Sequence, residues 1–113
     1  MSLHGHWCPV RAELDGEEAP VLALENMELL LHADTYTVRF AGEIHDHGVF
    51  IHTVTTLVLT GKHGAHAGRV IPAIYQLVGN RLRICYGLNG KEPADFTTTT
   101  GSCRYLVTYR RDA

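Results

Sequence analysis

The sequence predicts an all-β protein, an eight-stranded antiparallel up-and-down barrel with at most one short helix. Two largely apolar segments, Val70–Val78 and Arg81–Gly87, flank the dipeptide Gly79-Asn80, and both of its residues tolerate the positive φ of a tight hairpin turn. In the second segment apolar and polar residues alternate with a period of two, which is typical of a strand with one buried face. Closing a meander of short strands into a barrel removes exposed edges. A β-sandwich is the alternative.

Length and composition bound the class of protein. A chain of 113 residues with 45% hydrophobic and 19% charged residues predicts one globular domain, spanning residues 1–113. The net charge of −2 lacks the basic excess that binds phosphate, so we expect no nucleic-acid partner unless Arg104, Arg110 and Arg111 cluster. No apolar run reaches the ~18 residues of a membrane helix, and no leader pattern opens the chain. We therefore expect no membrane partner and a cytoplasmic location.

The first strand is expected within Leu3–Leu14, leading to a turn at Asp15-Gly16. Pro9 cannot donate a backbone hydrogen bond, so this strand should lie at an edge, start after Pro9, or carry a bulge there. The following stretch, Glu17–Asn26, is short and poorly capped. We expect at most one helical turn in it.

Every later element is expected to be a strand or a loop. The predicted strands, chosen for apolar alternation and β-branched content, are Met27–His32, Thr35–Phe40, Glu43–His52, Thr55–Thr60 and Arg104–Arg110, in addition to the hairpin above. The glycine-rich segment Gly61–Gly68 lacks the ending of a phosphate-binding loop, so we expect a flexible loop at the barrel mouth. Three widely spaced cysteines without a CxxC pair indicate reduced thiols.

The strand Glu43–His52 carries the residues with the most chemical potential. One of its faces holds Ile44, Asp46, Gly48, Phe50 and His52, and the other holds His45, His47, Val49 and Ile51. A one-residue change of register exchanges the two faces, so only one set can point inward.

If the first face is inward, Asp46 is a buried carboxylate that needs a partner, and Asp46 with His52 forms the candidate catalytic pair for moving a proton. If the second is inward, His45 and His47 become candidate metal ligands, because side chains at i and i+2 project from one face about 7 Å apart. The sequence specifies no third ligand. Solvent-facing histidines are the alternative.

An eight-stranded barrel is wide enough either to be filled by side chains or to hold one small ligand. Tyrosines favour a pocket with polar groups, because a buried phenol requires a hydrogen-bond partner. The candidate ligand-binding residues are Tyr36, Phe50, His52, Tyr75 and Tyr86.

Several separated motifs resemble one known group of proteins. Gly5-His6-Trp7 is similar to the Gly-x-Trp signature of lipocalin-type calycins, whose last strand lays an arginine across the tryptophan. Together with Asp15-Gly16, the hairpin and Pro93 before Phe96, it resembles a family of uncharacterised lipocalin-like bacterial domains common in planctomycetes. The resemblance implies a lipocalin-like barrel closed by Trp7 and by Arg110 or Arg111, with Arg110 preferred. It implies no activity, and this chain is richer in histidine than that pattern.

The sequence thus favours binding of a small, partly apolar molecule inside the barrel. One alternative is a small enzyme, an isomerase, cyclase or lyase, that uses a His/Asp proton shuttle in the same space. Another is a protein–protein interaction module with a filled barrel. No cofactor is required, although a divalent metal fits the histidines. Val49 and Ile51, if they face outward, favour a homodimer.

Overall fold

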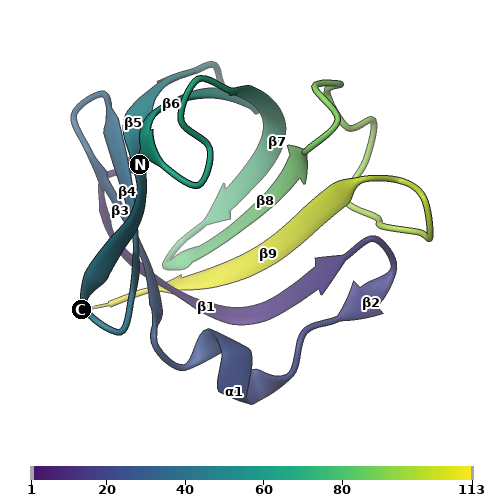
Figure 1. Ribbon diagram of the computed structural model, residues 1–113, viewed down its shortest axis with the longest axis horizontal. Coiled ribbons are helices and arrows are strands. Elements are labelled where there is room, and N and C mark those ends of the chain that lie inside the picture. The colour runs from purple at the N-terminus through teal and green to yellow at the C-terminus, as the bar shows by residue number, and fades with distance from the viewer. Residues whose placement is uncertain (1, 113) are drawn as a thin grey trace.

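The computed structural model describes residues 2–112, which form a closed antiparallel barrel (Figure 1). Eight strands follow one another around it in the order β1-β3-β4-β5-β6-β7-β8-β9, and pairing of β1 with β9 completes the closure. The elements are β1 (Gly5–Leu14), β2 (Glu17–Glu18), α1 (Val21–Leu24), β3 (Met27–His32), β4 (Thr35–Phe40), β5 (Glu43–His52), β6 (Thr56–Gly64), β7 (Val70–Val78), β8 (Arg81–Gly87) and β9 (Arg104–Arg111). The predicted all-β barrel with one short helix is confirmed.

The central hairpin has the predicted bounds, and its turn uses glycine in one specific way. Val78 pairs with Arg81 across Gly79-Asn80. Gly79 adopts a φ of 59°, whereas Asn80 is not among the residues with positive φ. Glycine with positive φ at the first central position is the pattern of a type II′ turn, which matches the twist of the flanking strands.

One predicted boundary is corrected, and the alternatives left open at Pro9 are resolved. Strand β6 continues to Gly64, because its ladder with β5 extends to the pair Asp46 and Gly64, so the loop predicted for Gly61–Gly68 is in part strand. Strand β1 begins before Pro9 and contains a register shift between Pro9 and Arg11. Of the three alternatives stated for Pro9, the structure has the bulge, which accommodates a residue without an N–H for the ladder.

The barrel interior is a continuous core to which every long strand contributes. Trp7 of β1 and Leu82 of β8 are fully buried, and the helix contributes Leu24. Further buried apolar residues line the interior from each strand: Ala12, Leu29, Leu31, Tyr36, Phe50, Leu57, Leu59, Ile71, Ala73, Ile84, Tyr86, Val107 and Tyr109. This single core confirms that the alternation seen in the sequence marks an inner and an outer face.

The N-terminal segment closes one end of the barrel through Trp7 and Arg111. The guanidinium carbon of Arg111 lies 4.3 Å from the Trp7 ring centroid. Arg111 Nη2 donates to the Ser2 carbonyl over 2.8 Å, Nη1 contacts the His4 carbonyl, and Trp7 Nε1 donates to the Leu3 carbonyl over 2.9 Å. We call this end, with the Gly79-Asn80 turn, the closed end, and the opposite end, which carries α1, the mouth.

The preference for Arg110 as the barrel-closing residue is therefore wrong. Register pairs Trp7 with Arg111 and Cys8 with Arg110. Since neighbouring residues on a strand point to opposite faces, Arg110 is exposed on the outside. The sequence alone could not show which of the two arginines faces Trp7, because the bulge in β1 shifts the pairing between β1 and β9 by one residue.

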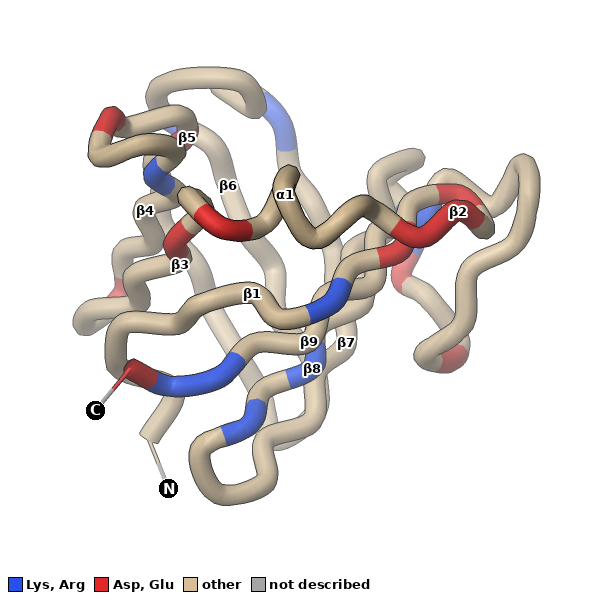
Figure 2. Tube along the Cα trace, turned by 90° about the horizontal axis from the view of Figure 1, so that it is seen from below, with Lys and Arg blue, Asp and Glu red and all other residues tan. Residues whose placement is uncertain are grey.

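Basic residues gather on the neighbouring strands β1, β8 and β9 (Figure 2), where Arg81 pairs with Arg110. Arg104 begins β9, whereas Arg110 and Arg111 end it, so the three arginines do not cluster. Arg104 instead pairs with Asp95 at 2.9 Å. Within residues 2–112, no helix combines the length and apolar character needed to cross a membrane.

Ile51 is 70% exposed and Val49 is half-buried on the same outward face of β5. This is the placement that the homodimer prediction assumed. The dimer itself stays a prediction.

Candidate functional site

A cavity of about 190 Å³ lies inside the barrel toward the mouth, and we call it the inner cavity. Its wall is mainly apolar, but two acidic residues, two histidines and four tyrosines are among the residues that line it. They are Pro9, Met27, Glu28, Leu29, Tyr36, Val38, His45, Asp46, Leu59, His66, Ile71, Tyr86, Leu88, Tyr105, Val107 and Tyr109. The barrel is therefore not completely filled by its own side chains, and an apolar pocket with a few polar groups is the usual form of a small-molecule site.

Strand β5 turns Asp46 inward, as one of the two predicted registers required. Asp46 and Phe50 are both only 3% exposed, and Gly48 between them is buried. The Gly48 position cannot accept a side chain, because an added Cβ would lie 2.1 Å from the Thr60 carbonyl oxygen and 2.7 Å from Tyr36 Cε2. The missing side chain lets the Tyr36 ring lie beside β5 and reach Asp46.

A β-bulge changes the facing of the residues just before Asp46. Val38 pairs with Asp46 but Arg39 pairs with Ile44, so His45 is the extra residue of the bulge. Ile44, expected on the inner face, is consequently 64% exposed, and His45, expected on the other face, is exposed but borders the cavity. Bulges of this kind redirect side chains next to functional sites, and they leave no clear mark in a sequence.

Asp46 is satisfied by two donors that come from different elements. The Tyr36 hydroxyl donates to Oδ2 over 3.1 Å, and the His66 backbone N–H donates to Oδ1 over 3.3 Å. A buried carboxylate is costly unless it is hydrogen-bonded, and these two bonds use part of its capacity to accept. Asp46 can therefore still accept a hydrogen bond from a group inside the cavity.

The tyrosines around the cavity are held in their neutral form. Burial, followed by the charge of Asp46 and the hydrogen bond to it, raises the pKa of Tyr36. Burial is also the main cause of the raised pKa of Tyr86 and of Tyr109, whose hydroxyls are 2.8 Å apart. At neutral pH these phenols act as hydrogen-bond donors and acceptors, and none of them is poised to act as a base.

The predicted ligand-binding residues divide between two pockets. Tyr36 and Tyr86 line the inner cavity. Phe50, His52 and Tyr75 instead line a second hollow, which lies beside the N-terminal segment at the other end of the barrel and is more open to solvent. Tyr75 donates its hydroxyl to the Thr53 carbonyl over 2.6 Å. The residues predicted to form one ligand-binding site therefore lie in two separate pockets.

The pairing of Asp46 with His52 is therefore wrong. Both residues have the same parity on β5, but five residues of strand lie between them and place them toward opposite ends of the barrel. Asp46 lines the inner cavity, while His52 is exposed in the hollow at the closed end, with Nδ1 3.3 Å from the Thr53 carbonyl.

The structure also separates the predicted metal ligands His45 and His47. His45 lines the inner cavity, and His47 lies on the outer face, where Nδ1 is 2.9 Å from Thr37 Oγ1 and its ring stacks on His63 at 6.3 Å. In the described part of the chain, the set of three metal-ligating side chains whose donor atoms lie within 4.8 Å of one another is a different one, His6, Cys8 and Asp112.

Several cavity residues were not among the predicted site residues. His66 reaches Asp46 because the loop after β6 folds back over the mouth, where the Ala65 N–H donates to the His45 carbonyl over 3.1 Å. Tyr105 and Tyr109 have the same parity on β9 as Val107, so alternation along that strand was the available signal. Cys85 is buried, and burial raises its pKa, which fits a packed side chain better than a nucleophile.

Comparison with models of known families, with curated proteins and with solved structures found no match. The predicted barrel is present in the structure, and the resemblance to lipocalin-like bacterial domains stays a prediction.

Proposed function

We propose that this protein binds a small, partly apolar molecule in the inner cavity. The observation that carries the proposal is the presence of a buried carboxylate, Asp46, in the wall of an otherwise largely apolar cavity of about 190 Å³. An engineered protein cavity of about 150 Å³ can hold benzene, so this space fits a molecule with one ring. Asp46 selects a ligand that carries a hydrogen-bond donor, such as a hydroxyl or a protonated amine.

The first experiment is native mass spectrometry of freshly purified protein, compared with the same sample after denaturation. A non-covalent adduct that disappears on denaturation supports the proposal, and its mass identifies the class of ligand. A spectrum of bare protein leaves affinity for added probes to decide the question.

Three one-ring probes then test the role of charge: benzylamine, benzyl alcohol and benzoate, each titrated by calorimetry. We expect benzylamine and benzyl alcohol to bind, and benzoate to be rejected because it would place two carboxylates together. Asp46→Asn should reduce the preference for benzylamine over benzyl alcohol at least about tenfold. Leu59→Trp, which fills the cavity, should abolish binding of both, while Leu77→Trp at the closed end should not. Equal binding of all three probes, or no effect of Leu59→Trp, would refute the proposal.

A proton-transfer enzyme is the second candidate, favoured by the two imidazoles of His45 and His66 that line the same cavity as Asp46. The identified ligand distinguishes the two functions. If the ligand is converted to a product and His45→Gln abolishes turnover without abolishing binding, catalysis is the function. If the ligand is recovered unchanged, binding is.

A further inference from the structure

A cluster of metal-ligating side chains lies on the outer wall of the barrel. His6 and Cys8 are two residues apart on β1, on either side of the inward-pointing Trp7, so both project outward. Asp112 follows the end of β9, and its backbone N–H donates to the His6 carbonyl over 2.8 Å. The pairing of β1 with β9 that closes the barrel therefore also brings these three side chains together.

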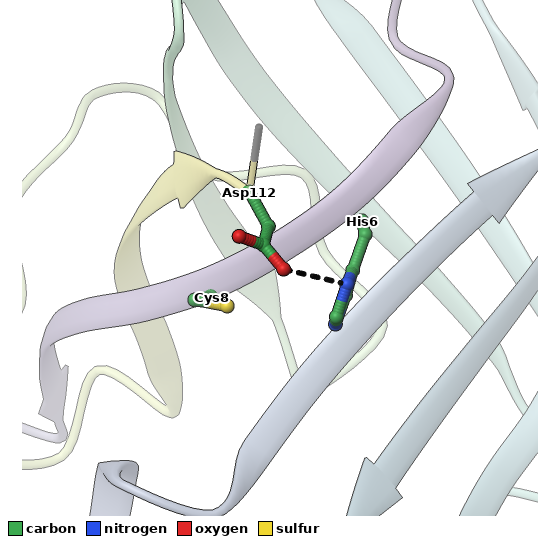
Figure 3. A group of neighbouring side chains, drawn as sticks. All are labelled: His6, Cys8 and Asp112. Atoms are coloured by element: carbon green, nitrogen blue, oxygen red, sulfur yellow. Dashed lines mark ion pairs between the residues drawn. The ribbon is translucent and has the colours of Figure 1, made fainter.

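The donor atoms of the cluster converge on one point (Figure 3). The imidazole of His6 faces the Asp112 carboxylate, and the sulfur of Cys8 points toward them. Asp112 Oδ2 lies 3.2 Å from His6 Nδ1. Two ligands bound to one tetrahedral zinc ion at ordinary zinc–nitrogen and zinc–oxygen distances are about 3.3 Å apart. The spacing is thus already close to that of two zinc ligands, and all three donor atoms lie within 4.8 Å of one another.

A second observation concerns the other nitrogen of the same ring. His6 Nε2 is shielded from solvent and forms an ion-pair contact with the Glu28 carboxylate of β3, without the alignment of a hydrogen bond. Histidines that bind metal commonly donate the far N–H to a carboxylate, which fixes the tautomer and orients the ring. Glu28 occupies that position, and it leaves Nδ1 as the ligand atom.

The surroundings are compatible with a bound cation. Two carboxylates, those of Glu28 on β3 and of Asp112 after β9, place negative charge beside His6. The nearest cationic strand partner is Arg110, whose Cα pairs with that of Cys8. Arg110 is exposed, so water screens its charge.

We propose that His6 Nδ1, Cys8 Sγ and Asp112 Oδ2 bind a divalent transition metal ion of the zinc class, with Glu28 orienting His6. Binding displaces the thiol proton of Cys8 to solvent, and water completes the tetrahedron as the fourth ligand. The ion ties the first barrel strand to the segment after the last one.

Cobalt(II) provides the test, because it takes zinc sites and reports a thiolate ligand by charge-transfer absorption. Titration of the metal-free protein with Co²⁺ should give this absorption, saturating at one ion per chain, and Zn²⁺ should displace it. Cys8→Ser should abolish the absorption. Glu28→Gln should keep it and weaken binding about 10–100-fold, the usual effect of losing an orienting carboxylate. Circular dichroism establishes that each variant is folded.

Matched controls are available in the same chain. Cys103→Ser alters another accessible thiol, and His47→Ala alters the outer His47–His63 stack, so both variants should bind Co²⁺ like the original protein. In the unaltered protein, Zn²⁺ should protect Cys8 but not Cys103 from alkylation by iodoacetamide, which needs no variant.

Absence of thiolate absorption with stoichiometric Co²⁺, or its persistence in Cys8→Ser, would overturn the proposal. So would equal alkylation of Cys8 with and without Zn²⁺. Any of these three results would leave His6, Glu28 and Asp112 as an ion-pair cluster only.

Discussion

At the scale of single residues, the contact between Tyr36 and Asp46 defines the polar part of the inner cavity. Period-two alternation on β5 predicted two sets of residues, one with Asp46 and one with His45 and His47, of which only one could face inward. It could not predict Tyr36 as its partner, because that contact depends on Gly48 and on the register of β4 with β5. It also could not place His45, whose facing is changed by a bulge.

Removing the Tyr36 hydroxyl should destabilise the protein. In Tyr36→Phe the buried Asp46 keeps one protein donor, the His66 N–H, and we expect the free energy of unfolding to fall by about 1–3 kcal/mol. Urea unfolding of Tyr36→Phe, Asp46→Asn and the double variant measures the coupling between the two side chains. We expect a coupling energy of about 0.5–3 kcal/mol. A coupling of zero would show that the hydroxyl and the carboxylate do not interact.

At the scale of secondary-structure elements, the joint between β1 and β9 determines whether the sheet becomes a barrel. The sequence predicted all eight barrel strands, because each carries its own alternation and turn signals. It predicted Pro9 as a place of irregularity, but not which arginine of β9 faces Trp7, since that choice depends on a one-residue shift in register.

Arg111 should therefore contribute to stability and Arg110 should not. Arg111→Ala removes a cation–π contact and donors to two carbonyls, and we expect a loss of about 1–3 kcal/mol in the free energy of unfolding. Arg110→Ala changes an exposed side chain, and we expect a change within about 0.5 kcal/mol. Chemical unfolding of the two variants side by side makes the comparison. A larger loss in Arg110→Ala would contradict the register described here.

At the scale of the whole molecule, the buried and half-buried tyrosines couple folding to alkaline pH. All five have a pKa raised above the ordinary value of 10.0, with burial as the first cause.

Closure of the barrel could be predicted from the sequence because it pairs the backbone groups of the two edge strands. The cavity could not, since the sequence does not show whether large side chains meet in the centre.

The folded protein should lose stability above about pH 10. Tyrosines in the unfolded chain ionise first there, so the unfolded state binds fewer protons, and the free energy of unfolding falls as pH rises toward the folded-state values. Below about pH 10 the contribution is fully present. Urea midpoints at about pH 8 and about pH 11, followed with tyrosinate absorbance, measure the effect. Free ionisation of all five tyrosines near pH 10 without unfolding would contradict it.

The central claim is that the inner cavity is the ligand site, and NMR mapping with benzyl alcohol tests it most directly. We expect saturable shifts in the backbone amides of Asp46, Leu59 and Val107 around the cavity, lost in Leu59→Trp. Shifts confined to Phe50, Tyr75 and Leu77 at the closed end, or no saturable shifts at all, would contradict the claim.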